Sequence, residues 1–347
     1  MKRIALFNHK GGVSKTTTTF NLSWMLALQG KKVIMIDADP QCNLTGLVFN
    51  EDDFEAFYSD SKKHNLKTCL APAFEAQPKL IEAAICQEIE IQSNSGGQLF
   101  LLPGHLDLSE YEVTLGIAQE LSTSLQTLKN LPGSFSYLLE KTAERYQADY
   151  VLIDMNPSLS SINQNLLMTS DYFLLPTSPD YFSVMALKSL KKILPRWAMW
   201  AKKAQMNPIL TETFYPFPMV TPKFLGTIVQ KYRERESKPS KGFEKWIDDI
   251  RKYVNNELVP ALRGKGGDDE MVMTLDGIHQ PIFKQFSDFN TLVALSQTYQ
   301  TPIFALTDRH FEDAKYSGVV KDTMKQSVAK FEKVFSDLAQ DIIKLTS

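Results

Sequence analysis

The sequence predicts an α/β fold in which a mostly parallel sheet is covered by helices on both faces. Short, almost entirely apolar segments alternate with segments whose apolar residues recur at helical spacing. Strands of a parallel sheet are buried on both faces, so they lack the polar–apolar alternation of half-exposed strands. The chain has 347 residues, of which 43% are hydrophobic and 22% charged. It is therefore long enough for a large core and too apolar to be disordered.

Six strands and four helices are expected in chain order. The strands are residues 3–7, 33–36, 99–102, 150–153, 172–175 and 224–229. The helices are residues 16–29, 134–146, 183–203 and 327–345. Gly30 is typical of a helix end, and Pro195 should kink or end the third helix. Two segments, about 50–97 and about 231–285, break the alternation, and we interpret them as insertions into a single domain spanning 1–347.

Composition excludes several classes of protein. Lys plus Arg total 38 and Asp plus Glu total 40, so the net charge of -2 excludes a uniformly basic polymer binder but not a local basic face. Cys42, Cys69 and Cys86 lack Cys-x-x-Cys spacing, which argues against a disulfide framework or a zinc site. No targeting segment is visible, and no apolar run approaches the roughly 18 residues of a membrane span. A cytoplasmic protein is expected.

A glycine-containing segment between the first strand and the first helix carries the clearest chemistry. Residues 8–17 read Asn-His-Lys-Gly-Gly-Val-Ser-Lys-Thr-Thr. Glycines let the backbone approach phosphate oxygens, and the helix N-terminus favours an anion. Lys15 can reach terminal phosphates, and the Thr16 hydroxyl can bind Mg²⁺. The usual phosphate-loop pattern is not met, because Ser14 precedes Lys15, and a second lysine, Lys10, stands at the start. A glycine-rich turn with chance lysines is the alternative.

Carboxylates follow two further strands. Asp37 and Asp39 come at the end of the second strand, and Asp154 ends the fourth. The carboxyl ends of parallel strands meet at one edge of a sheet, where nucleotides bind in α/β folds. Asp154 would then hold Mg²⁺, through water. The segment with Asp37 and Asp39 is also compatible with a polar loop that caps the next helix, and an apolar strand that ends in Asp, as at Asp154, is common.

Together these motifs resemble those of the deviant Walker A ATPases, the ParA/MinD group, and are most similar to ParA partition ATPases. Lys10 matches the signature lysine and Lys15 the phosphate-loop lysine. Three more segments are similar to family motifs, namely Asp-Ala-Asp-Pro-Gln-Cys-Asn at 37–43, Asp-Met-Asn-Pro-Ser-Leu at 154–159 and Leu-Pro-Thr-Ser-Pro-Asp-Tyr at 175–181. The chain departs from the family at Cys42, customarily glycine, at Asn156, customarily proline, and at Leu292, where the family often has a basic residue for DNA.

The resemblance implies a P-loop NTPase-like fold, ATP and Mg²⁺ as cofactors, and a set of site residues. The nucleotide would contact Lys10, Gly11, Gly12, Val13, Ser14, Lys15, Thr16 and Thr17. Thr16, Asp37 and Asp154 would hold Mg²⁺. Lys10, Lys15 and Asp39 would be catalytic, with Asp39 positioning or activating the attacking water. The segment 286–306 resembles a late loop and strand of the family, which makes Gln230 and Asp288 candidates for adenine contacts.

By the same resemblance, Lys10 would reach the nucleotide of the partner subunit, so that ATP lies inside a homodimer interface. Slow hydrolysis would then time the assembly. The ATP-bound dimer would bind DNA non-specifically, associate with the nucleoid, and partition or position cargo with a ParB-like or other adaptor protein. From Tyr181 to Thr211 the sequence has no acidic residue, whereas it has six basic residues: Lys188, Lys191, Lys192, Arg196, Lys202 and Lys203. They favour phosphate-backbone binding, with an ordinary solvated face as the alternative.

Two other functions remain open. A MinD-like membrane-associated positioning ATPase would need a basic amphipathic tail, whereas the last helix mixes Lys330, Lys333 and Lys344 with acidic residues, so no membrane is expected. A metabolic enzyme on the same scaffold, either an iron–sulfur reductase or an amidotransferase-like ligase, would need clustered thiolates or a second substrate pocket. Neither can be recognised in the sequence.

Overall fold

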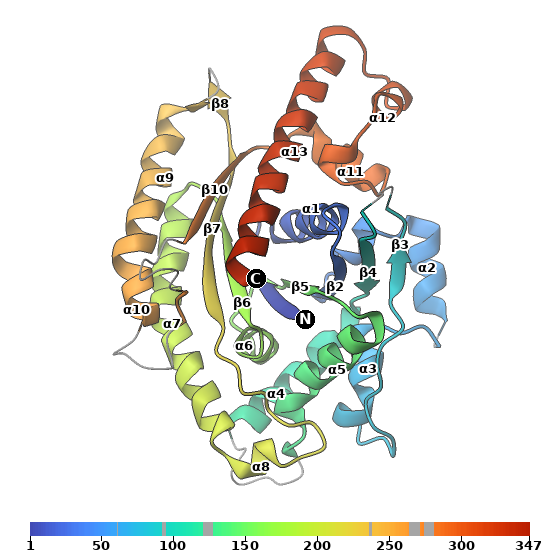
Figure 1. Cartoon of the computed structure of the whole chain (residues 1–347), viewed down its shortest axis with the longest axis vertical. Helices are drawn as coiled ribbons and strands as arrows, with labels where there is room; N and C mark the ends of the chain where they lie inside the picture. Colours follow the sequence, from blue (N-terminus) through green and yellow to red (C-terminus); the bar gives the residue numbers. More distant parts are fainter. Residues whose placement is uncertain (61, 92–94, 121–127, 236–237, 264–270, 274–280) are drawn as a thin grey trace.

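The computed structural model describes residues 1–60, 62–91, 95–120, 128–235, 238–263, 271–273 and 281–347. Its centre is an eight-stranded sheet with the order β10-β7-β6-β1-β5-β2-β4-β3 (Figure 1). Neighbouring strands run parallel except β3 and β4, which are antiparallel. The strands are β1 (Lys2–Leu6), β2 (Lys32–Ala38), β3 (Gln87–Ile89), β4 (Gln98–Leu102), β5 (Tyr150–Met155), β6 (Tyr172–Thr177), β7 (Lys223–Tyr232) and β10 (Ile282–Ser287). The predicted mostly parallel α/β fold is confirmed.

Helices cover both faces of the sheet. On one face lie α1 (Lys15–Leu28), α11 (Thr291–Thr298) and α13 (Gly318–Thr346). On the other lie α3 (Leu66–Phe74), α4 (Glu110–Glu120), α5 (Leu131–Tyr146), α6 (Ser161–Met168), α7 (Tyr181–Gln205) and α9 (Lys241–Tyr253). Shorter elements are η1 (Thr45–Leu47), α2 (Glu51–Ser59), η2 (Leu106–Ser109), α8 (Pro208–Thr211), β8 (Glu234–Arg235), β9 (Lys238–Pro239), η4 (Val254–Leu258), α10 (Val259–Arg263), η5 (Ile303–Ala305) and α12 (Asp308–Asp313).

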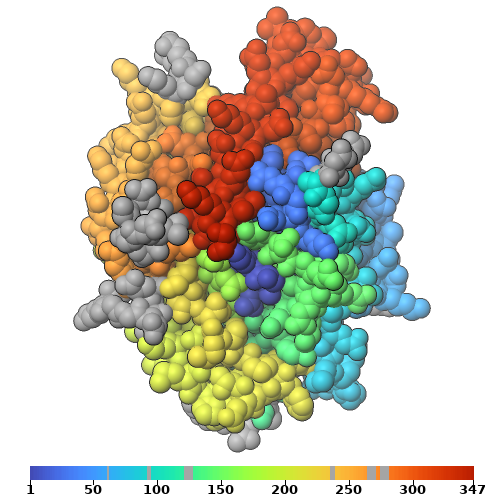
Figure 2. All heavy atoms as spheres, in the orientation of Figure 1, coloured from blue at the N-terminus to red at the C-terminus, as the bar shows by residue number. Residues whose placement is uncertain are grey.

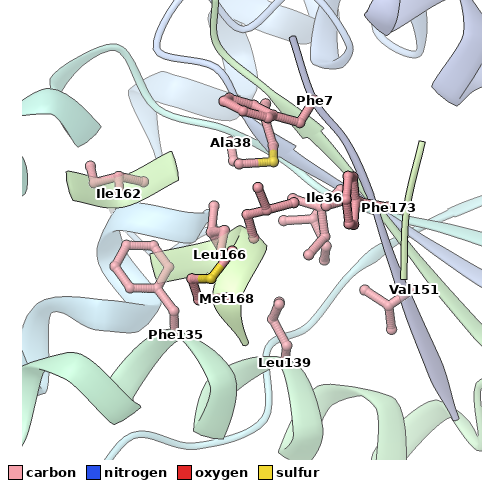
Figure 3. Close-up of a cluster of buried hydrophobic side chains, with 14 of the residues drawn as sticks. Phe7, Ile36, Ala38, Phe135, Leu139, Val151, Ile162, Leu166, Met168 and Phe173 are labelled. Carbon is pink, nitrogen blue, oxygen red and sulfur yellow. The ribbon is translucent and has the colours of Figure 1, made fainter. Parts of the chain in front are cut away.

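Strands β1, β2, β4, β5, β6 and β7 are largely apolar because each sends side chains into two separate cores. Ile4 and Leu6 of β1 enter the core beneath α1 and α13, whereas Ala5 and the following Phe7 enter the opposite core. Figure 3 shows that opposite core, where Phe7 and Phe173 of the sheet lie near Leu166 of α6. In α13 the apolar stripe packs against the sheet, and the space-filling view shows this helix lying across the face of the molecule (Figure 2).

The sheet order brings the functional segments together. Strand β1 lies between β5 and β6, and β2 lies on the far side of β5. In this register Leu6 is opposite Asp154, which is in turn opposite Asp37. The loop after β1 and the acidic ends of β2 and β5 therefore share one edge of the sheet.

Several sequence predictions need correction. The segment 231–285, predicted to be an insertion, ends too late, because β10 begins at Ile282 and pairs with β7 in the main sheet. Its central side chains Phe283, Lys284 and Gln285 are only half-buried, so β10 lacks the apolar pattern of the other strands. Residues 236–237, 264–270 and 274–280 of that segment lie outside the described residues, as do 61 and 92–94 of the segment 50–97.

Three more elements differ from expectation. Pro195 does not end its helix, since α7 runs unbroken to Gln205; proline removes only one helical hydrogen bond there. The late segment expected to contain a strand forms α11 and η5 instead. The terminal helix begins at Gly318 rather than near residue 327. Its first turns are largely exposed and lack the apolar stripe, so the sequence pattern did not reveal them. The segment 50–97 supplies β3, which forms the antiparallel edge of the sheet.

Candidate nucleotide-binding site

The loop between β1 and α1 is held at its start by one asparagine. Asn8 is fully buried, its Nδ2 donates to the Pro176 carbonyl at 2.8 Å, and its Oδ1 accepts from the Lys10 N–H at 2.9 Å. Further along, Gly12 and Ser14 adopt left-handed backbone conformations with φ of 71° and 59°. Alternation of left- and right-handed residues turns successive N–H groups toward one point, where an anion can bind. Ser14 also precedes the N-terminus of α1, which adds a partial positive charge.

Lys15 lies inside this loop. The side chain is buried and its Nζ donates to the Asn8 carbonyl at 3.1 Å. Burial lowers the pKa of Lys15, and the charges of Asp154 and Asp39 act in the opposite direction. A phosphate in the loop would supply the negative charge that this buried ammonium lacks.

Thr16 and Asp154 are joined directly. The Thr16 hydroxyl donates to Asp154 Oδ2 at 2.6 Å. Asp154 is buried beside Asp37, and burial together with that neighbouring carboxylate raises the pKa of Asp154 to about 8. A hydroxyl and a carboxylate are the hard oxygen donors that Mg²⁺ prefers, so these residues fit the ion that the sequence implies. Among the described residues, no three or more His, Cys, Asp and Glu side chains are grouped so that they could hold a metal ion by themselves.

Asp37 organises the loop that follows β2. Its Oδ2 accepts two bonds of 2.7 Å, from the backbone N–H and the hydroxyl of Thr45, and its Oδ1 accepts from the Asp39 N–H at 3.2 Å. Burial raises the pKa of Asp37 to about 6. All three predicted metal residues thus lie together, and Asp37 additionally fixes the position of Asp39.

The segment 39–45 contains an unforeseen contact. Asp39 is buried and its Oδ1 accepts from the Gln41 N–H at 2.9 Å. Cys42 stands where glycine is customary and has a φ of 52°, the left-handed conformation that favours glycine. The Tyr58 hydroxyl of α2 lies 3.6 Å from Cys42 Sγ and donates to the Gly104 carbonyl at 2.6 Å. No sequence signal pointed to Tyr58.

The segment 154–160 also closes on the loop. A Cβ placed on Gly11 would lie 3.9 Å from Pro157, so the two segments are in contact distance. Asn163 Nδ2 donates to Asn156 Oδ1 at 2.7 Å and to the Ser158 carbonyl at 2.8 Å. Asn156, which replaces a customary proline, is therefore held by its side chain.

The Lys10 side chain lies against the start of α7 in its own subunit. Its ammonium forms an ion pair with Asp180 and donates to Ser183 Oγ at 3.1 Å. Asp180 lay within a segment that the sequence singled out, but no role for it was inferred there.

The two adenine candidates occupy different places. Gln230 is fully buried, and its Nε2 donates to Thr18 Oγ1 at 2.7 Å, so it supports α1 behind the loop. Asp288 lines a cavity of about 560 Å³ together with Tyr232, Asn290, Met324 and Lys330. Leu292 borders the same cavity and is buried, so it is no surface position for DNA.

Comparison with known proteins identifies the family. A family model described as an AAA domain matches residues 1–206, more than half of the chain. The chain belongs to this family and is ParA-like. Chromosome partitioning protein ParA of Caulobacter vibrioides is 27% identical over 267 residues, which cover 76% of this chain and 80% of that protein.

Two solved structures share the ParA-like fold. The complex of Cyanothece McdA(D38A) with ATP has a TM-score of 0.56 at 18% identity and covers 95% of this chain and 96% of that one. The structure of pNOB8 ParA bound to nonspecific DNA has a TM-score of 0.53 at 19% identity and covers 99% and 98%. Within the described residues, no helix of this ParA-like chain has the length and apolar character to cross a membrane.

Proposed function

We propose that this ParA-like chain binds ATP with Mg²⁺, hydrolyses it slowly, and uses it to switch between a monomer and a homodimer that holds DNA. One observation carries the proposal. A single short loop carries the buried Lys15 next to Thr16, whose hydroxyl is bonded to Asp154, and the same loop carries a second lysine, Lys10, at its start. A triphosphate with its metal ion is the ligand that such a set of charges and donors fits.

Each residue then has a distinct task. Backbone N–H groups of residues 11–15 and the Lys15 ammonium neutralise phosphate charge. Thr16, Asp37 and Asp154 hold Mg²⁺, which when bound supplies further charge neutralisation. Asp39 accepts a hydrogen bond from the attacking water and orients it toward the terminal phosphate. The cavity beside Asp288 takes the base, and Gln230 keeps the loop in place from behind.

Lys10 acts across the dimer in this proposal. Two copies that meet through this edge of the sheet would each present Lys10 to the triphosphate of the other. Loss of the terminal phosphate would leave positive charges facing one another and favour separation.

A stripe on α7 is the proposed DNA contact. Lys188, Lys192, Arg196 and Lys203 are exposed and recur at helical spacing, whereas Lys191 is paired with Glu257 at 2.6 Å. The dimer doubles the stripe, which strengthens binding to the phosphate backbone without reading the bases. The pNOB8 ParA complex supports this use of the fold. A ParB-like or other adaptor would stimulate hydrolysis and connect the dimer to its cargo on the nucleoid.

Sedimentation and phosphate release test the proposal. With ATP and Mg²⁺ the wild-type chain should sediment as a dimer, and the Lys10→Ala variant as a monomer with little turnover. Binding to duplex DNA should need ATP, fall steeply with salt, and weaken in a Lys192→Glu/Arg196→Glu variant. A Lys333→Glu/Lys344→Glu variant, which makes the same change of charge on exposed α13 surface, is the matched control. A chain that ignores ATP, or binds it and stays monomeric, contradicts the proposal.

A further inference from the structure

The ion pair of Lys10 and Asp180 joins two elements that a dimer would have to use. Lys10 belongs to the loop after β1, and Asp180 is the N-cap of α7. One carboxylate oxygen, Oδ1, accepts from the Ser183 N–H at 2.8 Å and caps the helix, whereas Oδ2 holds the lysine. Ser183 Oγ, which accepts from the Ser178 N–H at 3.1 Å, completes the lysine's environment. The lysine is thus held within its own subunit by a preformed acceptor pair.

In this arrangement the Lys10 side chain cannot reach a nucleotide bound to another subunit. An ammonium that donates to Asp180 and Ser183 points back at its own α7, so it must rotate away before it can reach a phosphate on another subunit. A triphosphate carries more negative charge than one carboxylate and would compete for the lysine. The freed Asp180 would remain stabilised at the positive N-terminus of α7.

The surface beside this pair is suited to a second copy. Tyr181, Phe182 and Met185 follow Asp180 on the first turns of α7 and are 53%, 70% and 42% exposed. Exposed apolar side chains grouped beside a charged pair are typical of an interaction surface. The lysine would therefore leave Asp180 at the place where the subunits meet.

We propose, on the basis of the function proposed above, that Asp180 is a latch that holds Lys10 in the free subunit and thereby raises the protein concentration needed for ATP-dependent dimerisation. Asp180 is a positioning residue, because it acts through Lys10. Each dimer must open two latches. Partly exposed ion pairs are weak individually, so the combined effect on the dimer dissociation constant is roughly threefold to thirtyfold.

Asp180→Asn separates the latch from the helix cap, because asparagine is as good an N-cap as aspartate but carries no charge. The variant should dimerise at a threefold to thirtyfold lower protein concentration in saturating ATP and Mg²⁺. Asp180→Glu should restore the wild-type threshold. Because the Lys10→Ala chain should stay monomeric, the double variant is compared by thermal unfolding: Asp180→Asn should leave the midpoint of the Lys10→Ala chain unchanged, which a purely structural role would not predict.

A second measurement needs no dimer. Acylation of Lys10 by an N-hydroxysuccinimide ester, followed by mass spectrometry without nucleotide, should be several times faster in Asp180→Asn than in the wild type, with Lys333 as the internal reference. Equal acylation rates, or an Asp180→Asn dimer as weak as or weaker than the wild-type dimer, would overturn the latch. A wild-type chain that does not dimerise with ATP instead overturns the proposed function, and the latch's role in dimerisation with it.

Discussion

The Thr16 hydroxyl and the Asp154 carboxylate are joined by a hydrogen bond of 2.6 Å although 138 residues separate them in the chain. The bond exists because β1 and β5 are parallel neighbours, so the residues that leave their carboxyl ends lie side by side. It connects the start of α1, directly after the glycine-containing loop, to strand β5. A change in the position of Asp154 therefore reaches this loop through Thr16.

Thr16→Val should abolish the gain in ATP affinity that Mg²⁺ provides. Valine keeps the shape of threonine but removes both the metal ligand and the donor to Asp154. Altered metal contacts typically cost tenfold to a hundredfold in affinity. Fluorescent-nucleotide titrations with and without Mg²⁺ measure the effect. In excess chelator the variant and the wild type should bind alike, and a Mg²⁺-dependent gain that survives in the variant would exclude Thr16 as a ligand.

Lys15→Met should lose ATP binding without losing stability. The Lys15 ammonium is buried with one carbonyl partner, and burial lowers its pKa, so the nucleotide-free fold gains little from its charge. Thermal unfolding without nucleotide should show a midpoint equal to or above that of the wild type, whereas the rise in midpoint on adding ATP and Mg²⁺ should vanish. A variant that unfolds several degrees earlier without nucleotide would show that the lysine is structural.

Much of this architecture follows from sequence pattern alone. Strands β1, β2, β4, β5, β6 and β7 are continuous apolar segments because both faces of the sheet are buried, and that pattern identifies them. Strand β10 was not predicted because it is an edge strand with polar central side chains, Lys284 and Gln285. Helix α11 was not predicted because the family resemblance suggested a loop and a strand in this segment.

Contacts between distant segments are harder to predict. The two ends of β2 and β5 could be placed together because parallel strands share an edge, and so Asp37 and Asp154 were found. Nothing in the sequence places Tyr58 of α2 over Cys42, or Asp180 beside Lys10, since these contacts depend on how loops fold back over the sheet edge. Nothing in the sequence indicates that the side chain of Gln230, a candidate for adenine contacts, donates to the Thr18 hydroxyl.

Asp39→Asn should bind ATP and dimerise but release phosphate at least a hundredfold more slowly. Asparagine retains an oxygen that accepts from the Gln41 N–H, so the loop keeps its shape while the carboxylate charge is lost. General-base contributions are typically a hundredfold to ten-thousandfold. Single-turnover phosphate release measures the rate, and sedimentation confirms the dimer. Phosphate release at the wild-type rate would remove Asp39 from the mechanism.

Tyr58→Phe should change turnover without changing ATP affinity. The substitution removes the donor to the Gly104 carbonyl and the hydroxyl beside Cys42, which costs about 1 kcal/mol and loosens the loop that carries Asp39. Turnover should fall severalfold, with unchanged nucleotide binding in equilibrium titrations. Tyr316→Phe, in the segment between α12 and α13, is the control. Equal turnover in both variants would show that α2 does not influence the loop.

The stability of the fold should depend on pH through His64, a histidine in the segment 50–97. His64 Nδ1 accepts from the Ile85 N–H at 3.0 Å, which requires an unprotonated nitrogen, and burial lowers the pKa of His64 with help from the charge of Arg145. A lowered pKa means that this stabilisation is complete above about pH 6.5 and is lost as the pH falls through the lower, folded-state value.

The pH dependence of the wild-type stability also contains a contribution from the buried carboxylates. The raised pKa values of Asp37 and Asp154 make the fold gain stability as pH falls. The difference between wild type and His64→Asn removes their contribution. Asparagine Oδ1 can accept the same hydrogen bond at any pH, so the unfolding midpoint of the variant relative to the wild type should rise as the pH drops from 7.5 to 5.5. A difference that stays constant over this range would mean that the pKa of His64 is the same in the folded and the unfolded chain, so that its hydrogen bond does not oppose protonation.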